Sequence, residues 1–144
     1  MKKIMTFSTL ILIIAFSSCN GIKEASKKTT TQMVSGKYEI RSVEGASNLY
    51  NMFFVIDTSE KRISGKTDCN GFSGNYVVTG DEVTFLPFVS TKMYCEEHVM
   101  KVENSIFKAF NNTKKFTYDD NMLTLINEDG TISLKAYKVI TEDK

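Results

Sequence analysis

The chain has 144 residues, a length that suits one domain with a single modest hydrophobic core. Its 18 basic and 17 acidic residues leave a formal net charge of +1, which excludes the strongly basic surface typical of nucleic-acid-binding proteins. The sequence has no internal repeat and no low-complexity tract, so the composition is that of a globular protein. We therefore expect one folded unit that is monomeric and binds no nucleic acid.

The first 18 residues have the pattern of a lipoprotein signal peptide. Lys2 and Lys3 form a positive start, and an apolar run follows over residues 10–16. This run is about half of the ~20 residues that a membrane span needs. Ser-Ser-Cys at residues 17–19 resembles a lipobox, in which the peptide is cut before the cysteine and a diacylglycerol is attached to it. We expect lipidation of Cys19; an ordinary secretory peptide with a chance cysteine is the alternative.

Residues 19–36 are polar and rich in Lys, Thr and Ser, which predicts a flexible tether between the lipid and the domain. No apolar run long enough to span a bilayer follows Cys19, so the lipid is the expected membrane anchor. No acidic run follows Cys19 directly. Because such a run accompanies surface display in some Gram-negative groups, its absence favours a cell-envelope location on the outer membrane, facing the periplasm.

The domain itself is expected over residues 37–140. Its first half contains five segments with the alternation or composition of strands, at residues 37–43, 52–57, 62–66, 75–78 and 83–86. Gly80 and Asp81 separate the last two segments in the manner of a hairpin turn. Pro87 ends the fifth strand or marks a sheet edge.

The pattern changes to that of a helix over residues 96–110, where apolar side chains recur at spacings of three and four. Glu96 and Glu97 suit the first turn of a helix, and Asn111 and Asn112 predict its end. Three strand-like segments follow, at residues 115–118, 122–126 and 131–139. This order predicts a single α+β domain: a mostly antiparallel β-sheet, strongly curved or partly barrel-like, with one α-helix packed on it.

Two segments carry the densest polar chemistry of the chain. Gly65, Gly71 and Gly74 lie within ten residues, which predicts either positive φ angles or close approach of neighbouring atoms. They belong to the pattern G-x-x-x-C-N-x-x-x-G-x-Y over residues 65–76, and S-T-x-M-x-C follows at residues 90–95. The paired motifs resemble those of the META domain, also called HslJ-like, over about residues 35–140.

The resemblance implies a compact antiparallel domain that is frequent in exported lipoproteins and has no established catalytic activity. The family has loose associations with stress resistance, virulence and motility. The chain departs from the family pattern at Asp68, where glycine is common, and at Tyr38, where many members have tryptophan. Neither departure changes the expected fold.

Cys69 and Cys95 are the two cysteines that remain besides Cys19. In an exported chain an even pair predicts a disulfide. The alternative is a zinc site, because Cys95 and His98 have a C-x-x-H spacing and Cys69 would add a third ligand. No fourth ligand is evident, so we predict the disulfide and no metal site.

His98 is the only histidine, so a Ser–His–acid or Cys–His catalytic arrangement would have to use it. We expect it to be an exposed or partly satisfied helix residue. The acid pairs Glu96/Glu97, Asp119/Asp120 and Glu142/Asp143 are sequence neighbours, whose side chains point apart on a helix or strand. We therefore predict no catalytic residues and no cofactor; an enzyme that uses His98 is a minor alternative.

A candidate binding surface surrounds the glycines and comprises Asp68, Asn70, Phe72, Ser73, Asn75, Thr91 and Tyr94. The polar members would line a small cleft, or else Asn70 and Thr91 would only hydrogen-bond the loop backbone. Phe72 and Tyr94 would be contact aromatics if exposed, and core residues if not.

The combination of anchor, tether and stapled loop predicts a non-catalytic envelope lipoprotein that binds another envelope protein or a ligand. Inhibition of an incoming hydrolase is one form of this hypothesis, by analogy alone. A structural or assembly role in the envelope is the alternative.

Overall fold

The computed structural model describes residues 32–47, 49 and 52–140. The expected signal peptide, Cys19 and most of the expected tether lie outside the described residues. The elements in chain order are β1 (Gly36–Val43), β2 (Phe53–Asp57), β3 (Arg62–Lys66), β4 (Gly71–Thr79), β5 (Glu82–Phe85), β6 (Val89–Ser90), α1 (Glu97–Asn112), β7 (Thr113–Asp119), β8 (Met122–Asn127) and β9 (Ile132–Lys138).

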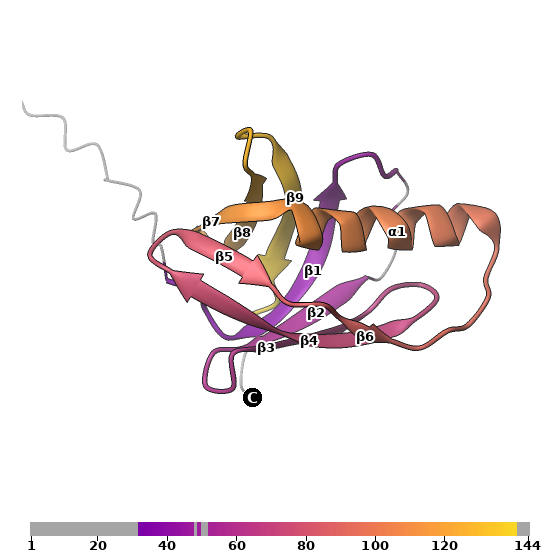
Figure 1. The fold of residues 1–144 in the computed structure, drawn as a ribbon, viewed down its shortest axis with the longest axis horizontal. Helices are drawn as coiled ribbons and strands as arrows, with labels where there is room; N and C mark the ends of the chain where they lie inside the picture. Colours follow the sequence, from indigo (N-terminus) through magenta and orange to yellow (C-terminus); the bar gives the residue numbers. More distant parts are fainter. Residues whose placement is uncertain (1–31, 48, 50–51, 141–144) are drawn as a thin grey trace, which may run out of the picture.

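The strands form one antiparallel sheet in the order β3-β2-β1-β9-β8-β7-β5-β4-β6. A further pairing between β3 and β4 joins the two ends of this order, so that eight strands close into a barrel. The short β6 is left outside the closed ring, beside β4. α1, the one helix among the described residues, lies against the barrel and packs on β1, β5, β8 and β9 (Figure 1). The α+β prediction with a curved antiparallel sheet is confirmed.

The core lies between α1 and the inner face of the barrel, and it is rich in aromatic rings. Phe110 of α1 packs edge-on against Phe54 and Phe85, with ring centroids 5.5 and 4.9 Å apart. Tyr38 stacks on Phe54 from β1, and its hydroxyl donates to the Val34 carbonyl at 2.7 Å. Burial raises the pKa of Tyr38 above its ordinary range, so the phenol stays protonated and keeps this donor.

Strand boundaries differ from the sequence prediction mainly in two places. β4 begins at Gly71, four residues before the predicted start, because its glycine-rich first half hides the alternation of Phe72 and Tyr76. β6 was not predicted at all, since a two-residue strand has no period to detect. The structure also places Gly36 in β1, paired with Ile56, so the folded part starts before Lys37.

Gly65, Gly71 and Gly74 lie within strands, and positive φ angles occur instead at Gly36, Gly45, Gly80 and Gly130. The positive-φ alternative is therefore wrong for the three motif glycines. At Gly65 and Gly74, glycine is needed because neighbouring atoms lie too close for a side chain. A Cβ atom on Gly65 would lie 2.5 Å from the Phe53 carbonyl oxygen, and one on Gly74 would lie 2.4 Å from the Phe88 ring.

Replacing Gly65 with alanine is expected to lower the free energy of unfolding by about 1–3 kcal/mol, because a backbone oxygen and the buried Phe72 ring both stand in the way. Gly71→Ala is the matched control, since its Cβ would meet nothing nearer than 3.8 Å. The control is expected to be neutral or to gain a few tenths of a kcal/mol. Urea unfolding of both variants checks this, and equal effects would contradict it.

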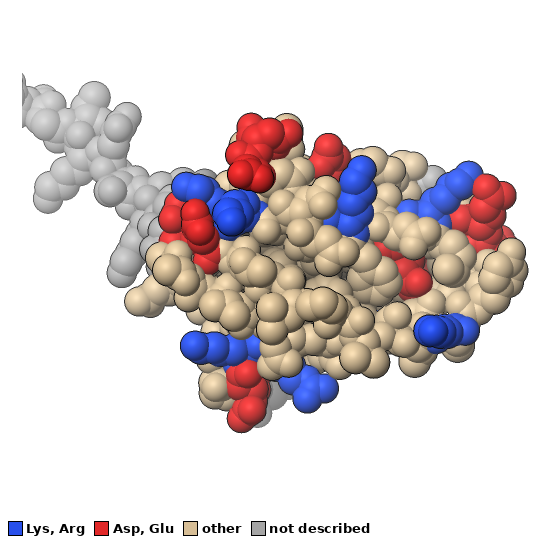
Figure 2. Space-filling view, in the orientation of Figure 1, with Lys and Arg blue, Asp and Glu red and all other residues tan. Residues whose placement is uncertain are grey.

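Charges of both signs are interspersed on the face drawn in Figure 2, and no large area of one sign appears there. This distribution agrees with the near-neutral sequence. Within the described residues, no helix is both long and apolar enough to cross a bilayer.

Candidate binding surface

A disulfide joins Cys69, in the β3–β4 connection, to Cys95, just before α1. The bond links chain positions 26 residues apart and ties the glycine-rich segment to the start of the helix. Cys69 is buried, and its neighbour Asn70 is buried as well. The disulfide therefore has one cysteine, Cys69, in the interior and the other, Cys95, close to the surface.

Glu103 of α1 is a buried carboxylate, with only 4% of its surface exposed. Its Oε2 accepts hydrogen bonds from the Thr67 hydroxyl and from the Asn70 backbone N–H, the latter at 3.1 Å. Its Oε1 accepts from the Asn70 side-chain amide at 2.9 Å. The carboxylate thus satisfies three donors from the β3–β4 connection, and it holds this connection against the helix.

Sequence analysis missed Glu103, although the sequence contains a signal for it. Residues 103, 106 and 110 share one face of α1, and Ile106 and Phe110 on this face are fully buried. A charged residue on an apolar helical face is buried only where hydrogen-bond donors meet it. The donors come from the same motif that carries Cys69 and Asn70.

Asn70 connects this interior network to the segment that leads into α1. Its side-chain oxygen accepts from the Thr91 hydroxyl at 2.7 Å and from the Met93 backbone N–H at 2.9 Å. Its side-chain nitrogen also donates to the Met93 carbonyl at 3.3 Å. Both Asn70 and Thr91 therefore hydrogen-bond the loop, which is the simpler of the two interpretations given for them.

The seven predicted surface residues are separated by the structure into interior and exterior groups. Phe72 is 5% exposed and packs against Phe107 and Phe110, so of its two alternatives it is a core residue and not a contact aromatic. Alternation along β4 directs its side chain into the barrel. Tyr94, in contrast, is 95% exposed.

The remaining polar residues do not converge on one cleft. Ser73 and Asn75 lie on the outer side of β4. The Ser73 hydroxyl accepts a hydrogen bond from the Arg62 guanidinium at 3.4 Å, and the Asn75 side-chain amide donates to the Lys61 carbonyl at 3.5 Å. Asp68 is exposed beside the disulfide and lines a hollow that contains none of the other six residues. The structure thus brings Asn70 and Thr91 together and leaves Asp68, Ser73 and Asn75 at separate places.

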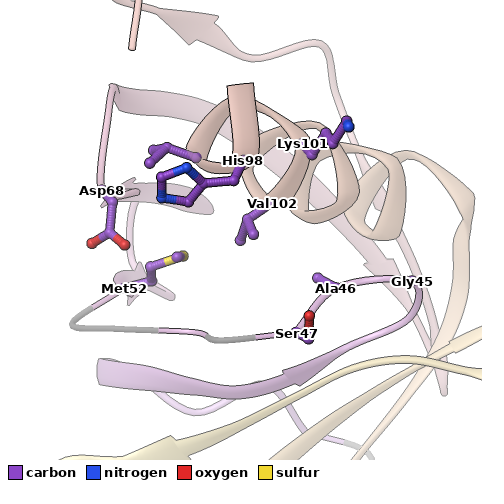
Figure 3. A pocket seen from close by; sticks show the side chains of 9 residues that line it. Gly45, Ala46, Ser47, Met52, Asp68, His98, Lys101 and Val102 are labelled. Carbon is purple, nitrogen blue, oxygen red and sulfur yellow. The ribbon is translucent and has the colours of Figure 1, made fainter. Parts of the chain in front are cut away.

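The hollow beside Asp68 has a volume of about 360 Å³ and is shown in Figure 3. Its wall combines Asp68 and His98 with the apolar side chains of Met52 and Val102. The His98 side chain is 76% exposed, and its Nδ1 lies 3.3 Å from the exposed Glu96 carboxylate. Among the described residues, the ionisable groups in the wall of the hollow, Asp68, His98 and Lys101, are all exposed.

Metal ligands do not gather in the part of the chain that the structure describes, where no group of three or more His, Cys, Asp or Glu side chains could hold an ion. The sulfur atoms of Cys69 and Cys95 are bonded to each other, which removes both from the zinc alternative.

A family model for the META domain matches residues 31–138, which include both motif segments and strands β1 to β9. The chain belongs to the META domain family. The buried Asn70–Glu103 network and the Cys69–Cys95 disulfide are thus features of how this META domain holds its two motif segments together. A search of curated proteins found no match.

Solved structures with a similar fold support the architecture of the META domain. An NMR structure of a protein from Burkholderia xenovorans has a TM-score of 0.57 at 16% identity, with 74% of this chain and 83% of that chain covered. A crystal structure of a DUF4847 family protein from Bacteroides vulgatus has a TM-score of 0.56 at 13% identity, with coverage of 75% and 95%. At these identities the likeness concerns the fold alone.

Proposed function

We propose that this META-domain protein is a lipid-anchored component of the cell envelope that binds another envelope protein or a ligand and catalyses no reaction. The anchor is the diacylglycerol on Cys19, in the outer membrane and facing the periplasm. The family association with stress resistance makes envelope stress the condition in which this binding matters. The contact surface in this proposal is centred on Met93 and Tyr94.

One observation carries the proposal: interior bonds hold a loop whose side chains are exposed. Asn70 binds both backbone groups of Met93, and the disulfide holds Cys95 two residues later. The side chains of Met93 and Tyr94 are nevertheless 56% and 95% exposed. A loop fixed in this way loses little conformational entropy on binding, and tyrosine is a frequent anchor of protein interfaces.

Partner capture from detergent-solubilised envelopes tests the proposal with the full-length protein. Its intact mass is expected to be that of a chain starting at a lipidated Cys19. The double variant Met93→Ser/Tyr94→Ser is expected to lose the captured partner because the apolar contact area is gone. Tyr137→Ser on β9 removes another exposed tyrosine and is the matched control, which should retain the partner.

Two outcomes would contradict the proposal. If the double variant retained the same partners as the control, the loop would not be the contact. If deletion of the gene disturbed envelope integrity while all loop variants stayed silent, the structural or assembly role would replace the binding role.

A further inference from the structure

β6 is the one strand in the described part of the chain with a neighbour on a single side. It pairs with the first half of β4 through Ser90 with Phe72 and Val89 with Ser73. The Thr91 N–H also donates to the Gly71 carbonyl at 3.0 Å. In this antiparallel register the bonds to β4 come from Val89 and Thr91, so the N–H and C=O of Ser90 are directed away from β4.

An apolar groove of about 350 Å³ lies between this open edge and α1, and its lining includes Phe88, Ser90, Phe107 and Asn111. Phe88 forms part of its wall because Gly74 lets the ring lie directly on the backbone of β4. The Phe88 and Phe107 rings are 6.1 Å apart and only partly buried. The volume is at the lower end of the roughly 300–1,000 Å³ that ligand sites take, which suits one or two side chains rather than a whole cofactor.

Charge near the groove favours a particular kind of occupant. Residues 86–94 contain one charged side chain, that of Lys92, and no acid. Residues 83–91 contain no charged side chain, and Figure 2 shows an uncharged band between β5 and β6. Leu86 and Val89 belong to this segment and are exposed, Val89 at 77%. An apolar segment with an acidic residue placed beside Lys92 complements this surface.

The position of the groove favours a protein over the membrane that carries the anchor. The chain enters the domain at Gln32 and Met33, which share a hollow with Val78 and Gly80. These residues are at one end of β4, and Ser90 pairs with Phe72 near the other end. The six residue steps from Phe72 to Val78 span about 20 Å. The groove therefore lies near the end of β4 that is opposite to Gln32 and Met33.

We propose that an extended segment of a partner protein adds to β6 as a further strand. Its backbone bonds the N–H and C=O of Ser90, and alternate apolar side chains enter the groove between Phe88 and Phe107. An acidic residue of the segment lies beside Lys92. This inference rests on the proposed binding function and names the chemistry of the partner. Backbone bonds supply affinity in such strand addition, and the side-chain pockets supply specificity.

A displayed library of random nine-residue peptides, selected on the purified domain, supplies the probe. The enriched peptides are expected to alternate apolar and polar residues and to carry Asp or Glu near one end. In ¹⁵N NMR spectra they are expected to shift the amide signal of Ser90 and to slow its hydrogen exchange. A copy of the best peptide with alternate backbone nitrogens methylated is expected to bind at least tenfold more weakly, because it lacks the donors.

Ser90→Pro removes the outward N–H while leaving the bonds that Val89 and Thr91 make to β4, and an edge strand tolerates proline at such a position. This variant is expected to bind the best peptide at least tenfold more weakly, whereas Ser90→Ala is expected to bind it normally. If Ser90→Pro fails to fold, the methylated peptide gives the same comparison on the unaltered domain.

Several results would overturn the inference. The first is that the methylated peptide binds as tightly as the unmethylated one. The second is that the selected peptides leave the Ser90 amide signal unshifted. The third is that lipid vesicles or self-association, and not the peptide, change the Ser90 signal. If Ser90→Pro retained the envelope partners that Met93→Ser/Tyr94→Ser lost, strand addition would be wrong and the proposed function would stand. If neither Ser90→Pro nor Met93→Ser/Tyr94→Ser lost any envelope partner, both strand addition and the proposed binding function would be wrong.

Discussion

Replacing Glu103 with alanine is expected to lower the free energy of unfolding by about 3 kcal/mol. The change removes the charged acceptor that the Asn70 backbone N–H, the Asn70 amide and the Thr67 hydroxyl share in the interior. A hydrogen bond to a charged group contributes about 1.5–3 kcal/mol. Each donor keeps a second acceptor, which is the Thr67 hydroxyl oxygen, the Met93 carbonyl and the Asn70 carbonyl, respectively, so part of the sum is offset. Urea unfolding monitored by circular dichroism measures the loss.

Two further variants separate the hydrogen bonds from general effects on α1. Asn104→Ala changes the exposed neighbour of Glu103 and is expected to stay within about 0.5 kcal/mol of the wild type. Glu103→Gln keeps one acceptor oxygen but turns an NH₂ group toward donors, so an intermediate loss of about 1–2 kcal/mol is expected. An unchanged stability of Glu103→Ala would show that the network is dispensable.

Removal of the disulfide is the second large effect that we expect. In the chain-entropy relation a bridge between positions 26 residues apart contributes about 3.5 kcal/mol, so Cys69→Ala/Cys95→Ala is expected to lose about this amount. The loss arises because the unfolded chain regains the freedom that the bridge removes. Chemical unfolding of the double variant and of the reduced wild-type domain should give similar values.

The position of the bridge predicts where the effect is felt first. Amide hydrogen exchange is expected to accelerate most at residues 91–95, because the bond network to Asn70 then acts alone. Titration of the oxidised protein is expected to find neither Cys69 nor Cys95 as a free thiol. Two free thiols together with tightly held zinc would instead support the metal alternative.

Much of the fold is predictable from the sequence because its patterns are local. The helix over residues 96–110 has a regular apolar face, and the structure has it at Glu97–Asn112. The hairpin turn at Gly80 and Asp81 is confirmed, with a positive φ of 63° at Gly80. Closure of the barrel is different, because the β3–β4 pairing leaves no separate signature in either strand.

The candidate surface was less predictable because it depends on which side of a strand each residue occupies. Asn70 and Phe72 lie in a glycine-rich stretch in which no alternation is visible, and both are buried. Glu103 was overlooked because a carboxylate is ordinarily expected to be exposed to solvent. Its hydrogen-bond donors, Asn70 and Thr67, are 33 and 36 residues away in the sequence. Tyr94 has no neighbouring pattern at all, and only the three-dimensional structure places it outside.

The central position of β1 has a consequence for how the domain forms. β1 lies between β2 and β9, and its pairing with β9 joins Tyr38 to Lys138 across almost the whole domain. A contact of such long sequence separation carries a large loop-closure entropy and slows folding. β1 therefore obtains its second neighbour only when β9 has left the ribosome. Truncation within β9 would not produce a smaller barrel, because it would open β1 and β8 together.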